Sequence, residues 1–405
     1  MTTPSAQPQR LYFLDWLRIA AFGLLILYHV GMYYVSWDWH VKSPAAGPVL
    51  EPWMRLSSPW RLSLLFLVSG AATSLMLMRG AGAAFVRSRS KRLLLPLVFG
   101  MCIIVPPQPY FEVVHKAGYA GTYLDFLRLY FTGYGGFCRG NDCLILPTWN
   151  HLWFVLYLWV YSVLLWAGLR LRPGALDALA RITARALRGP RLIVLPIAAL
   201  ALIRLALGAR FPSTHALVDD WFNHAMYFAM FIVGATFARL PDVWGRFAAW
   251  RWFGLVAALA AWSVVALYAG PYNAKTAPEW LRVAYATMQW CAIVAAVGFA
   301  HRHLNRDHRC RRYLTEAVFP VYIVHQTLII VCTQMLAPLQ WSPALEGPLL
   351  VTATFALSFA CFEIVRRVRV LRPWFGLGPL PAAPSSARPC DLPALKETPG
   401  RPKFP

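Results

Sequence analysis

Ten long apolar stretches, separated by short polar segments, run along the 405-residue chain. A helix needs about 20 mostly apolar residues to cross a bilayer, and these stretches approach or exceed that length. We place them at residues 11–36, 57–78, 93–113, 151–169, 192–208, 221–238, 252–270, 281–300, 314–336 and 347–365. The pattern predicts an all-α polytopic membrane protein with about ten transmembrane helices, for which the lipid bilayer is the first partner.

Basic residues are distributed unevenly between the two sides of this predicted bundle. With the N-terminus inside, 28 of the 39 Lys and Arg residues fall in inside segments, 7 fall in outside segments and 4 lie within spans. Cytoplasmic loops of membrane proteins collect Lys and Arg. We therefore expect ten spans with both termini cytoplasmic.

The composition supports the same class. Hydrophobic residues make up 58% of the chain and charged residues 14%, against roughly 45–50% and about 25% in ordinary soluble domains. This rules out a disordered chain and argues against a conventional soluble enzyme. The net charge of +22 would suggest nucleic-acid binding in a soluble protein. In this chain the charge follows mostly from the topology, and we expect no nucleic-acid partner.

Two segments differ from the rest. Residues 114–150, on the outside, are rich in Tyr, Phe and Gly, and their LDFLRLYF stretch predicts an interfacial helix or a re-entrant piece. Cys138 and Cys143 would form a disulfide only if this segment faces an oxidising compartment, and the sequence leaves that open. We assign residues 1–370 to the membrane domain and 371–405 to a cytoplasmic tail, which nine prolines among its last 33 residues predict to be disordered.

The first span contains three ionisable side chains, Asp15, Arg18 and His29. Such groups are costly inside a membrane, and their default interpretation is functional. Arg18 and His29 are eleven residues apart, so they share one helical face, separated by about 16 Å at a rise of ~1.5 Å per residue. Asp15 can pair with Arg18. The alternative is that Asp15 and Arg18 reach the inner interface while His29 hydrogen-bonds a neighbouring helix.

A basic cluster of Arg87, Arg89, Lys91 and Arg92 precedes the third span. Arg89 and Arg92 lie one helical turn apart, which suits two guanidinium groups that hold phosphates. A positive flank on the cytoplasmic side of a span has the same pattern.

Histidines also stand in two later spans. His151 opens the fourth span, two residues before Trp153, and the ninth carries Glu316, Tyr322 and His325. A single histidine among aromatic residues is more often a packing residue than a catalytic one. The spacings match no histidine metal pattern, so we expect no metal, and both a Gly-rich phosphate loop and a GxSxG motif are absent. A P-loop pump and a serine hydrolase are therefore poor fits.

Taken together, these motifs resemble the acyltransferase-3 family of integral membrane acyltransferases. The likeness runs from about residue 10 to 370 and is carried, in order, by Arg18-x10-His29, Ser69-Gly70, Arg89-x2-Arg92, His151-Leu-Trp-Phe and Tyr322-x2-His325-Gln. Ser69-Gly70 is expected to allow close helix packing. The first span looks most like a branch that the resemblance associates with succinylation of periplasmic glucans.

The resemblance implies an acyltransferase of the bacterial inner (cytoplasmic) membrane. It would move an acyl group from cytoplasmic acyl-CoA, acetyl-CoA or succinyl-CoA, to hydroxyls of an exported glycan, with His29 as general base. An acyl-histidine intermediate is a less favoured variant. The implied site residues are catalytic His29, Arg18 and Asp15; donor-binding Arg87, Arg89 and Arg92; and, for the acceptor or a secondary site, His151, Trp153, Tyr322, His325 and Glu316.

A proton-coupled secondary transporter of a small or sugar-like substrate is the competing hypothesis. In it, His29, Asp15 and Arg18 would relay protons and substrate. Binding of coenzyme A separates the two, because a transporter has no use for it. A purely structural scaffold would leave the ionisable face of the first span unexplained.

Overall fold

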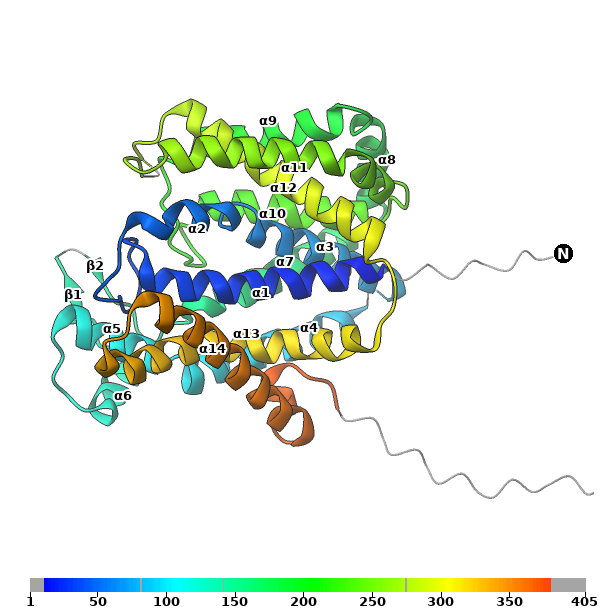
Figure 1. Ribbon diagram of the computed structural model, residues 1–405. Coiled ribbons are helices and arrows are strands. Elements are labelled where there is room, and N and C mark those ends of the chain that lie inside the picture. Colours follow the sequence, from blue (N-terminus) through cyan, green and yellow to red (C-terminus); the bar gives the residue numbers. More distant parts are fainter. Residues whose placement is uncertain (1–10, 81, 141, 274, 380–405) are drawn as a thin grey trace, which may run out of the picture.

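The computed structural model describes residues 11–80, 82–140, 142–273 and 275–379. In this part of the chain, long helices run side by side between two ends of a bundle (Figure 1). The helices are α1 (Tyr12–Tyr34), α2 (Glu51–Ser57), α3 (Arg61–Arg79), α4 (Ala83–Phe99), α5 (Pro107–Ala117), α6 (Tyr123–Thr132), α7 (Trp153–Leu171), α8 (Ala175–Ala186), α9 (Arg191–Leu207), α10 (Trp221–Phe237), α11 (Val243–Tyr268), α12 (Glu279–His303), α13 (Arg309–Leu336) and α14 (Pro343–Arg367). A hairpin pairs β1 (Cys138–Arg139) with antiparallel β2 (Asp142–Cys143).

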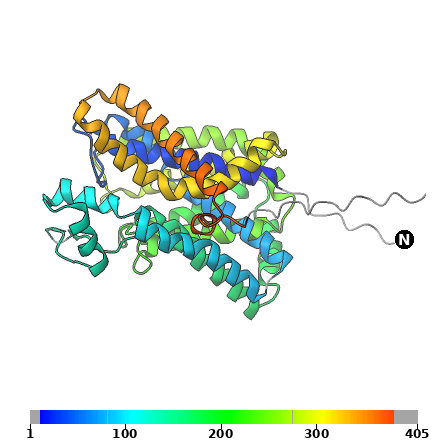
Figure 2. The same ribbon diagram turned by 90° about the horizontal axis from the view of Figure 1, so that it is seen from below.

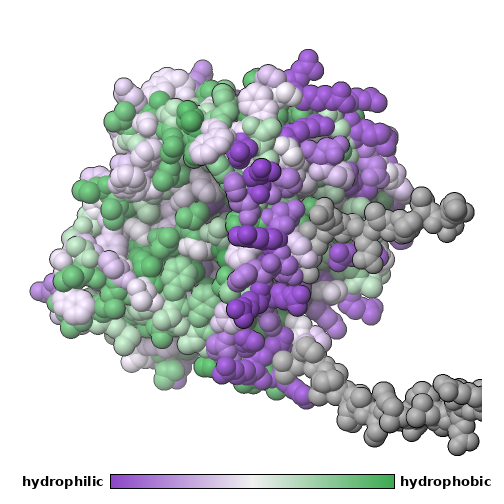
Figure 3. Space-filling view, turned by 45° about the vertical axis from the view of Figure 1, so that its right-hand side comes forward, coloured by the Kyte–Doolittle hydropathy of each residue, from purple (hydrophilic) through white to green (hydrophobic). Residues whose placement is uncertain are grey.

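The two ends of the bundle differ in kind. At one, the hairpin end, β1 and β2 lie with α5 and α6; at the other, the terminal end, α1 begins and α4 and α13 have their first turns (Figure 1). The view from below again places α5 and α6 opposite the start of α1 (Figure 2). Hydrophilic side chains gather toward the terminal end, while apolar ones cover much of the rest of the face in Figure 3.

The helices fit a multi-pass membrane protein. Among the described residues, seven helices are long and apolar enough to cross a membrane, or up to nine if each of two bent pairs forms one span. The stretch at 221–238 corresponds to α10, which has 17 residues. The count of ten and the cytoplasmic termini stay predictions. Of the expected tail, residues 380–405 lie outside the described residues.

Two helices extend beyond the expected stretches. The third stretch was placed at 93–113, and α4 begins at Ala83, so the basic cluster lies within this helix. A π-helical turn, Gly100–Ile104, extends α4, and α5 follows at an angle of 44°. The prolines at 106 and 107 fall at this break, as expected for residues that cannot continue a helix. Residues 175–186, which were counted in a connecting segment, form the helix α8, and the angle between α8 and α9 is 116°.

Glycines allow a close helix contact in the bundle wall. A Cβ on Gly70 of α3 would lie 1.9 Å from the carbonyl oxygen of Phe231, and a Cβ on Gly234 of α10 would lie 1.8 Å from that of Leu67. The backbones of α3 and α10 therefore approach as closely as small residues allow. The expected packing role of the Ser69-Gly70 motif is confirmed for Gly70.

The long segment after α5 is ordered by local chemistry. Thr122 and Asp125 form a reciprocal capping box at the start of α6, and Gly133 ends this helix in the left-handed conformation at φ 71°. The LDFLRLYF stretch is thus helical, as predicted. Cys138 and Cys143, which the sequence left open, are joined by a disulfide across the hairpin.

Candidate active site

His29 lies in the next-to-last turn of α1 and lines a cavity of about 540 Å³. We call it the histidine cavity, because His40, His151 and His215 line it as well. Its wall is assembled from α1, α3, α5, α7, α10, α13 and the loops between them. Trp39, Trp149, Trp153, Tyr28 and Tyr227 contribute aromatic rings to the lining.

The arrangement around His29 fixes which of its nitrogens carries the proton. Nδ1 of His29 is 2.8 Å from Nε2 of His325, and Nδ1 of His325 is 2.6 Å from the carbonyl oxygen of Tyr322. A carbonyl oxygen only accepts, so Nδ1 of a neutral His325 must donate and its Nε2 must accept. The proton of a neutral His29 therefore lies on Nδ1. Its Nε2, which has no hydrogen bond to any described residue, keeps a free lone pair.

His325 supports His29 without lining the cavity. Its side chain is 0% exposed, and the two imidazole rings stack at 5.1 Å with an interplanar angle of 8°. His151 meets the ring of His325 edge-on at 5.2 Å. The structure thus brings together His29, His151 and His325, which lie far apart in the sequence.

A second hydrogen-bond network holds His151. Its Nε2 donates to the carbonyl oxygen of Ile323 at 3.1 Å, so its Nδ1 accepts from the amide of Gln108 at 3.3 Å. The oxygen of Gln108 accepts from Gln326, and the amide of Gln326 also donates to His40 at 2.9 Å. Tyr322 donates its hydroxyl to the carbonyl of His151. These bonds occupy both ring nitrogens of His151, whereas His29 keeps an unused nitrogen at the cavity surface.

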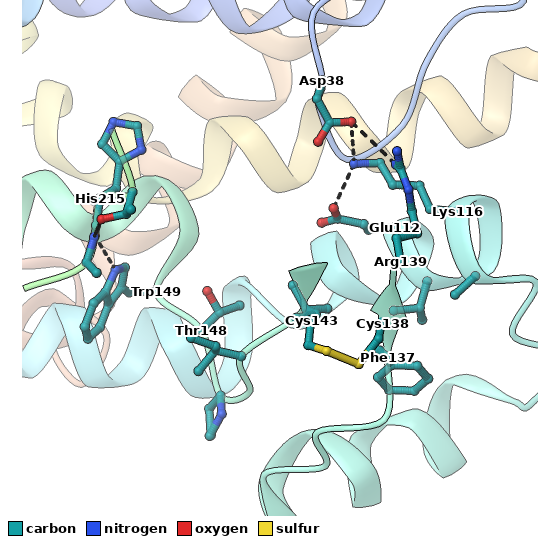
Figure 4. Close-up of a pocket in the computed structure, with 17 residues that line it drawn as sticks. Asp38, Glu112, Lys116, Phe137, Cys138, Arg139, Cys143, Thr148, Trp149 and His215 are labelled. Carbon is teal, nitrogen blue, oxygen red and sulfur yellow. Dashed lines mark hydrogen bonds and ion pairs between the residues drawn. A yellow bond between two sulfur atoms is a disulfide. The ribbon is translucent and has the colours of Figure 1, made fainter. Parts of the chain in front are cut away.

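Next to the histidine cavity lies a second recess of about 460 Å³, the vestibule, drawn in Figure 4. The two share lining residues, namely Asp38, Glu112, Lys116, Thr148, Trp149, Thr214 and His215. Lys116 lies between Asp38 and Glu112, 2.9 Å from each carboxylate, and the disulfide forms another side of the recess (Figure 4).

The loop after α9 completes the cavity wall. His215 stacks on Trp153 at 4.3 Å, and its carbonyl accepts from Trp149 at 3.1 Å. Its backbone is held at φ 55°, a conformation uncommon for a residue with a Cβ. The buried carboxylate of Asp220 fixes this loop, accepting from the backbone of His215 at 3.2 Å and from Tyr157 at 2.5 Å.

The predicted donor-binding arginines lie toward the terminal end. Arg89 is half-buried and donates to the hydroxyls of Ser162 at 3.2 Å and Thr73 at 3.5 Å. Arg87 and Arg92 are exposed. Arg18 of α1 and Arg92 lie close enough for their like charges to act on Arg89. Arginines of α1 and α4 therefore lie near one another, and the hydrogen-bond partners of Arg89 are neutral hydroxyl groups.

Asp15 has a partner that the sequence did not suggest. Its carboxylate accepts from Arg311 of α13 at 2.5 Å, although its charge also acts on Arg18. Arg311 is only 1% exposed and also binds Asp307 at 2.7 Å. The hydrogen bond from this guanidinium holds the pKa of Asp307 below its ordinary value. Asp15 thus ties α1 to α13, about four helical turns from His29.

Glu316 does not belong with the other residues expected at the acceptor site. It lies in the second turn of α13 and pairs with Arg372, in the short helix after α14, at 3.0 Å. It is absent from the lining of the histidine cavity, whereas Trp153, Tyr322 and His151 are part of it. The structure therefore does not bring Glu316 together with the other residues predicted for the acceptor site, and its role stays a prediction.

Comparison with known proteins decides the family. Residues 11–363 match the family model described as an acyltransferase domain. The chain belongs to the acyltransferase-3 family. Glucans biosynthesis protein C of Escherichia coli strain SMS-3-5 and that of strain K12 are each 25% identical to it over 380 residues, covering 90% of this chain and 94% of the relative. No solved structure matches the chain significantly.

Within this acyltransferase-3 chain, sequence reasoning found the histidines but missed most of their setting. No sequence motif singled out Gln108, His40 or Asp220, which lie in loops or helices without a recognised pattern. Arg61 did carry a signal, as an ionisable residue inside an apolar stretch, but no role was drawn from it. Arg311 was counted only as part of a basic flank.

Proposed function

We propose that this membrane acyltransferase moves an acyl group, acetyl or succinyl, from cytoplasmic acyl-CoA to hydroxyls of a periplasmic or envelope glycan. The observation that carries the proposal is His29, whose Nδ1 is engaged by His325 while its Nε2 is free at the surface of the histidine cavity. The names of the relatives support a glucan acceptor. The bacterial inner membrane is the location that this division of substrates requires.

In the proposed orientation, the terminal end faces the cytoplasm and the hairpin end faces the periplasm. The excess of Lys and Arg in the segments that join the spans at the terminal end supports this direction. Arg87, Arg89 and Arg92 would then meet the phosphates of coenzyme A, with Arg18 beside them. Guanidinium groups suit this task because they offer several donors in a fixed plane.

The chemical step needs a base next to the acceptor hydroxyl. Nε2 of His29 takes the hydroxyl proton as the oxygen attacks the thioester carbon. The new C–O ester bond forms, the C–S bond breaks, and the thiolate of coenzyme A leaves with the electron pair and receives the proton from the imidazolium. His325 is a positioning residue in this scheme, since it holds the ring in the tautomer that leaves Nε2 free.

The histidine cavity and the vestibule would receive the glycan. Sugar rings have apolar faces that pack against aromatic side chains, and Trp39, Trp149 and Trp153 line the cavity beside His29. The vestibule would give the glycan its path from the hairpin end.

The test is mass spectrometry of periplasmic and envelope glycans from cells that carry the wild-type protein or His29→Ala. An acyl mass increment that is lost with His29→Ala, at equal protein level in the membrane, is the expected result. Its size identifies the acyl group. Membranes with the wild-type protein should also bind coenzyme A.

Other outcomes would redirect the proposal. Unmodified glycans in both strains, with coenzyme A binding intact, would overturn the glycan acceptor and leave a lipid or small molecule. Loss of both glycan modification and coenzyme A binding would favour the proton-coupled transporter.

A further inference from the structure

Arg61 is the first residue of α3 and lines the histidine cavity together with His29. Only 4% of its surface is exposed. An arginine stays charged in any protein environment, so a full positive charge lies in the wall of the histidine cavity.

This charge has no anionic partner in the described part of the chain. The guanidinium carbon lies 3.4 Å from the ring centroid of Tyr28, a cation–π contact, but Nε and Nη1 make no hydrogen bond. These two buried nitrogen atoms therefore have no hydrogen-bond acceptor among the described residues. A ring face compensates part of the desolvation of a guanidinium and none of its unmet hydrogen bonds.

Nearby Arg55 shows how the charge of a buried arginine is usually compensated. It is also buried, six residues earlier in the chain, and it binds the carboxylate of Glu51 at 3.0 Å. A buried arginine whose role is structural is expected to have such a partner. Arg61 therefore differs from Arg55, because it has no carboxylate partner among the described residues.

The acidic residues of the cavity are already occupied. Glu112 accepts from His40 at 2.5 Å and from Lys116 at 2.9 Å, and Asp38 also accepts from Lys116. All of them lie where the cavity joins the vestibule. Arg61 also lines the cavity, and among the described residues its charge has no carboxylate partner.

The position of Arg61 relates this charge to the reaction. The ring of Tyr28 lies 3.4 Å from the guanidinium carbon and 6.0 Å from the imidazole centroid of His29. The guanidinium carbon is thus no farther from the imidazole than the sum of these distances. A carboxylate suits a cation at this distance from the base, because a guanidinium can bind it with two parallel hydrogen bonds.

We propose that Arg61 binds a carboxylate carried by a substrate next to the group that reacts at His29. This rests on the proposed acyl transfer. Two sources share the chemistry, namely the free end of a dicarboxylic acyl chain and an acidic sugar of the acceptor. In either case Arg61 is a specificity-determining residue, because neutral substrates would leave its charge buried and unpaired.

The experiment measures binding by the purified full-length protein in lipid nanodiscs. One arm compares succinyl-CoA with butyryl-CoA, which has the same chain length without the carboxylate. The other compares a glucose oligosaccharide with one of equal length that carries glucuronic acid. We expect one anionic probe to bind about tenfold to a hundredfold more tightly than its neutral counterpart, and Arg61→Met to abolish that preference.

Two further variants separate recognition from folding. Arg61→Lys keeps the charge without the planar pair of donors and should retain part of the preference. Arg61→Met should be at least as thermally stable as the wild type, because it removes an unpaired buried charge. A marked loss of stability in Arg61→Met, with no probe preference in the wild type, would assign Arg61 to packing and overturn the proposal.

The outcomes distinguish this inference from the function it rests on. A preference only among the donors assigns the carboxylate to the acyl chain, and a preference only among the sugars assigns it to the acceptor. Equal binding within both pairs overturns the role of Arg61 even if acyl transfer is real. If neither acyl-CoA binds the wild type, the proposed donor is wrong, while the sugar arm still decides whether Arg61 recognises a carboxylate.

Discussion

The basic cluster in α4 and the histidine cavity hold polar groups in different ways. Toward the terminal end, Arg87 and Arg92 are exposed and Arg89 reaches only hydroxyls. At the histidine cavity, His151 and His325 are buried and each ring nitrogen has a defined partner. The first arrangement leaves cations ready for a mobile, highly charged ligand, and the second fixes imidazole orientation before any ligand arrives.

Under the proposed function, this difference gives the two regions separate tasks. Exposed arginines bind by charge and tolerate variation in geometry, so their loss should weaken donor binding. A preorganised imidazole acts at one atom, so its loss should slow the chemical step. The comparison therefore predicts that variants at the two ends affect different kinetic constants, and it fails if they do not.

The largest expected effect is at the cavity. His29→Ala should lower kcat by about 10²- to 10⁴-fold, the usual contribution of a positioned general base, and leave acyl-CoA affinity unchanged. Single-turnover transfer and equilibrium binding of acyl-CoA measure the two quantities on the same preparation. A His29→Ala protein that also loses acyl-CoA affinity would mean that the two ends are not functionally separate.

The next largest effect is expected at His325, which does not line the histidine cavity. His325→Phe removes the acceptor for Nδ1 of His29 and should lower kcat by about a hundredfold, as misplacement of a catalytic group does, with KM unchanged. His325→Gln places an amide oxygen near the position of Nε2 and should recover much of the activity. Equal loss in both variants would reduce His325 to a packing residue.

A smaller effect is expected at the other end of the bundle. Arg89→Gln should raise KM for acyl-CoA by about tenfold, since one charge-assisted interaction is lost, and leave kcat nearly unchanged. Arg170→Gln is the matched control, because Arg170 is an exposed cation in the last turn of α7 outside the cluster. If both variants behave alike, the basic cluster serves topology alone.

The sequence predicted these two regions to different extents. The helices followed from apolar length, and the arginines from their place beside a span, because both depend on residues near each other in the chain. His29 and Arg18 were found because ionisable groups inside a span stand out. The pairing of His29 with His325 joins residues 296 positions apart, and no local pattern encodes such a contact.

Contacts between helices were missed for the same reason. Helical spacing predicted that Asp15 can pair with Arg18, and its charge does act on Arg18, but its carboxylate also binds Arg311 of α13, a helix that packs against α1. Glu316 was grouped with His325 because they share α13, although nine residues of helix separate them by about 13 Å. Spacing along one helix predicts a shared face and does not reveal which other helix covers that face.

The smallest expected effect tests whether the vestibule belongs to the cavity. The disulfide joins residues only five positions apart, so its removal should lower stability by only about 2 kcal/mol, the low end for a disulfide. Because Cys138 and Cys143 line the vestibule, the Cys138→Ser, Cys143→Ser double variant should raise KM for the glycan by about twofold to threefold through a looser wall. Acyl-CoA affinity should stay the same.

The control variant is Cys102→Ser, because Cys102 is an exposed free thiol in the π-helical turn. A change in acyl-CoA affinity with unchanged glycan KM would place the donor, instead of the acceptor, at the hairpin end and reverse the proposed orientation of the whole bundle.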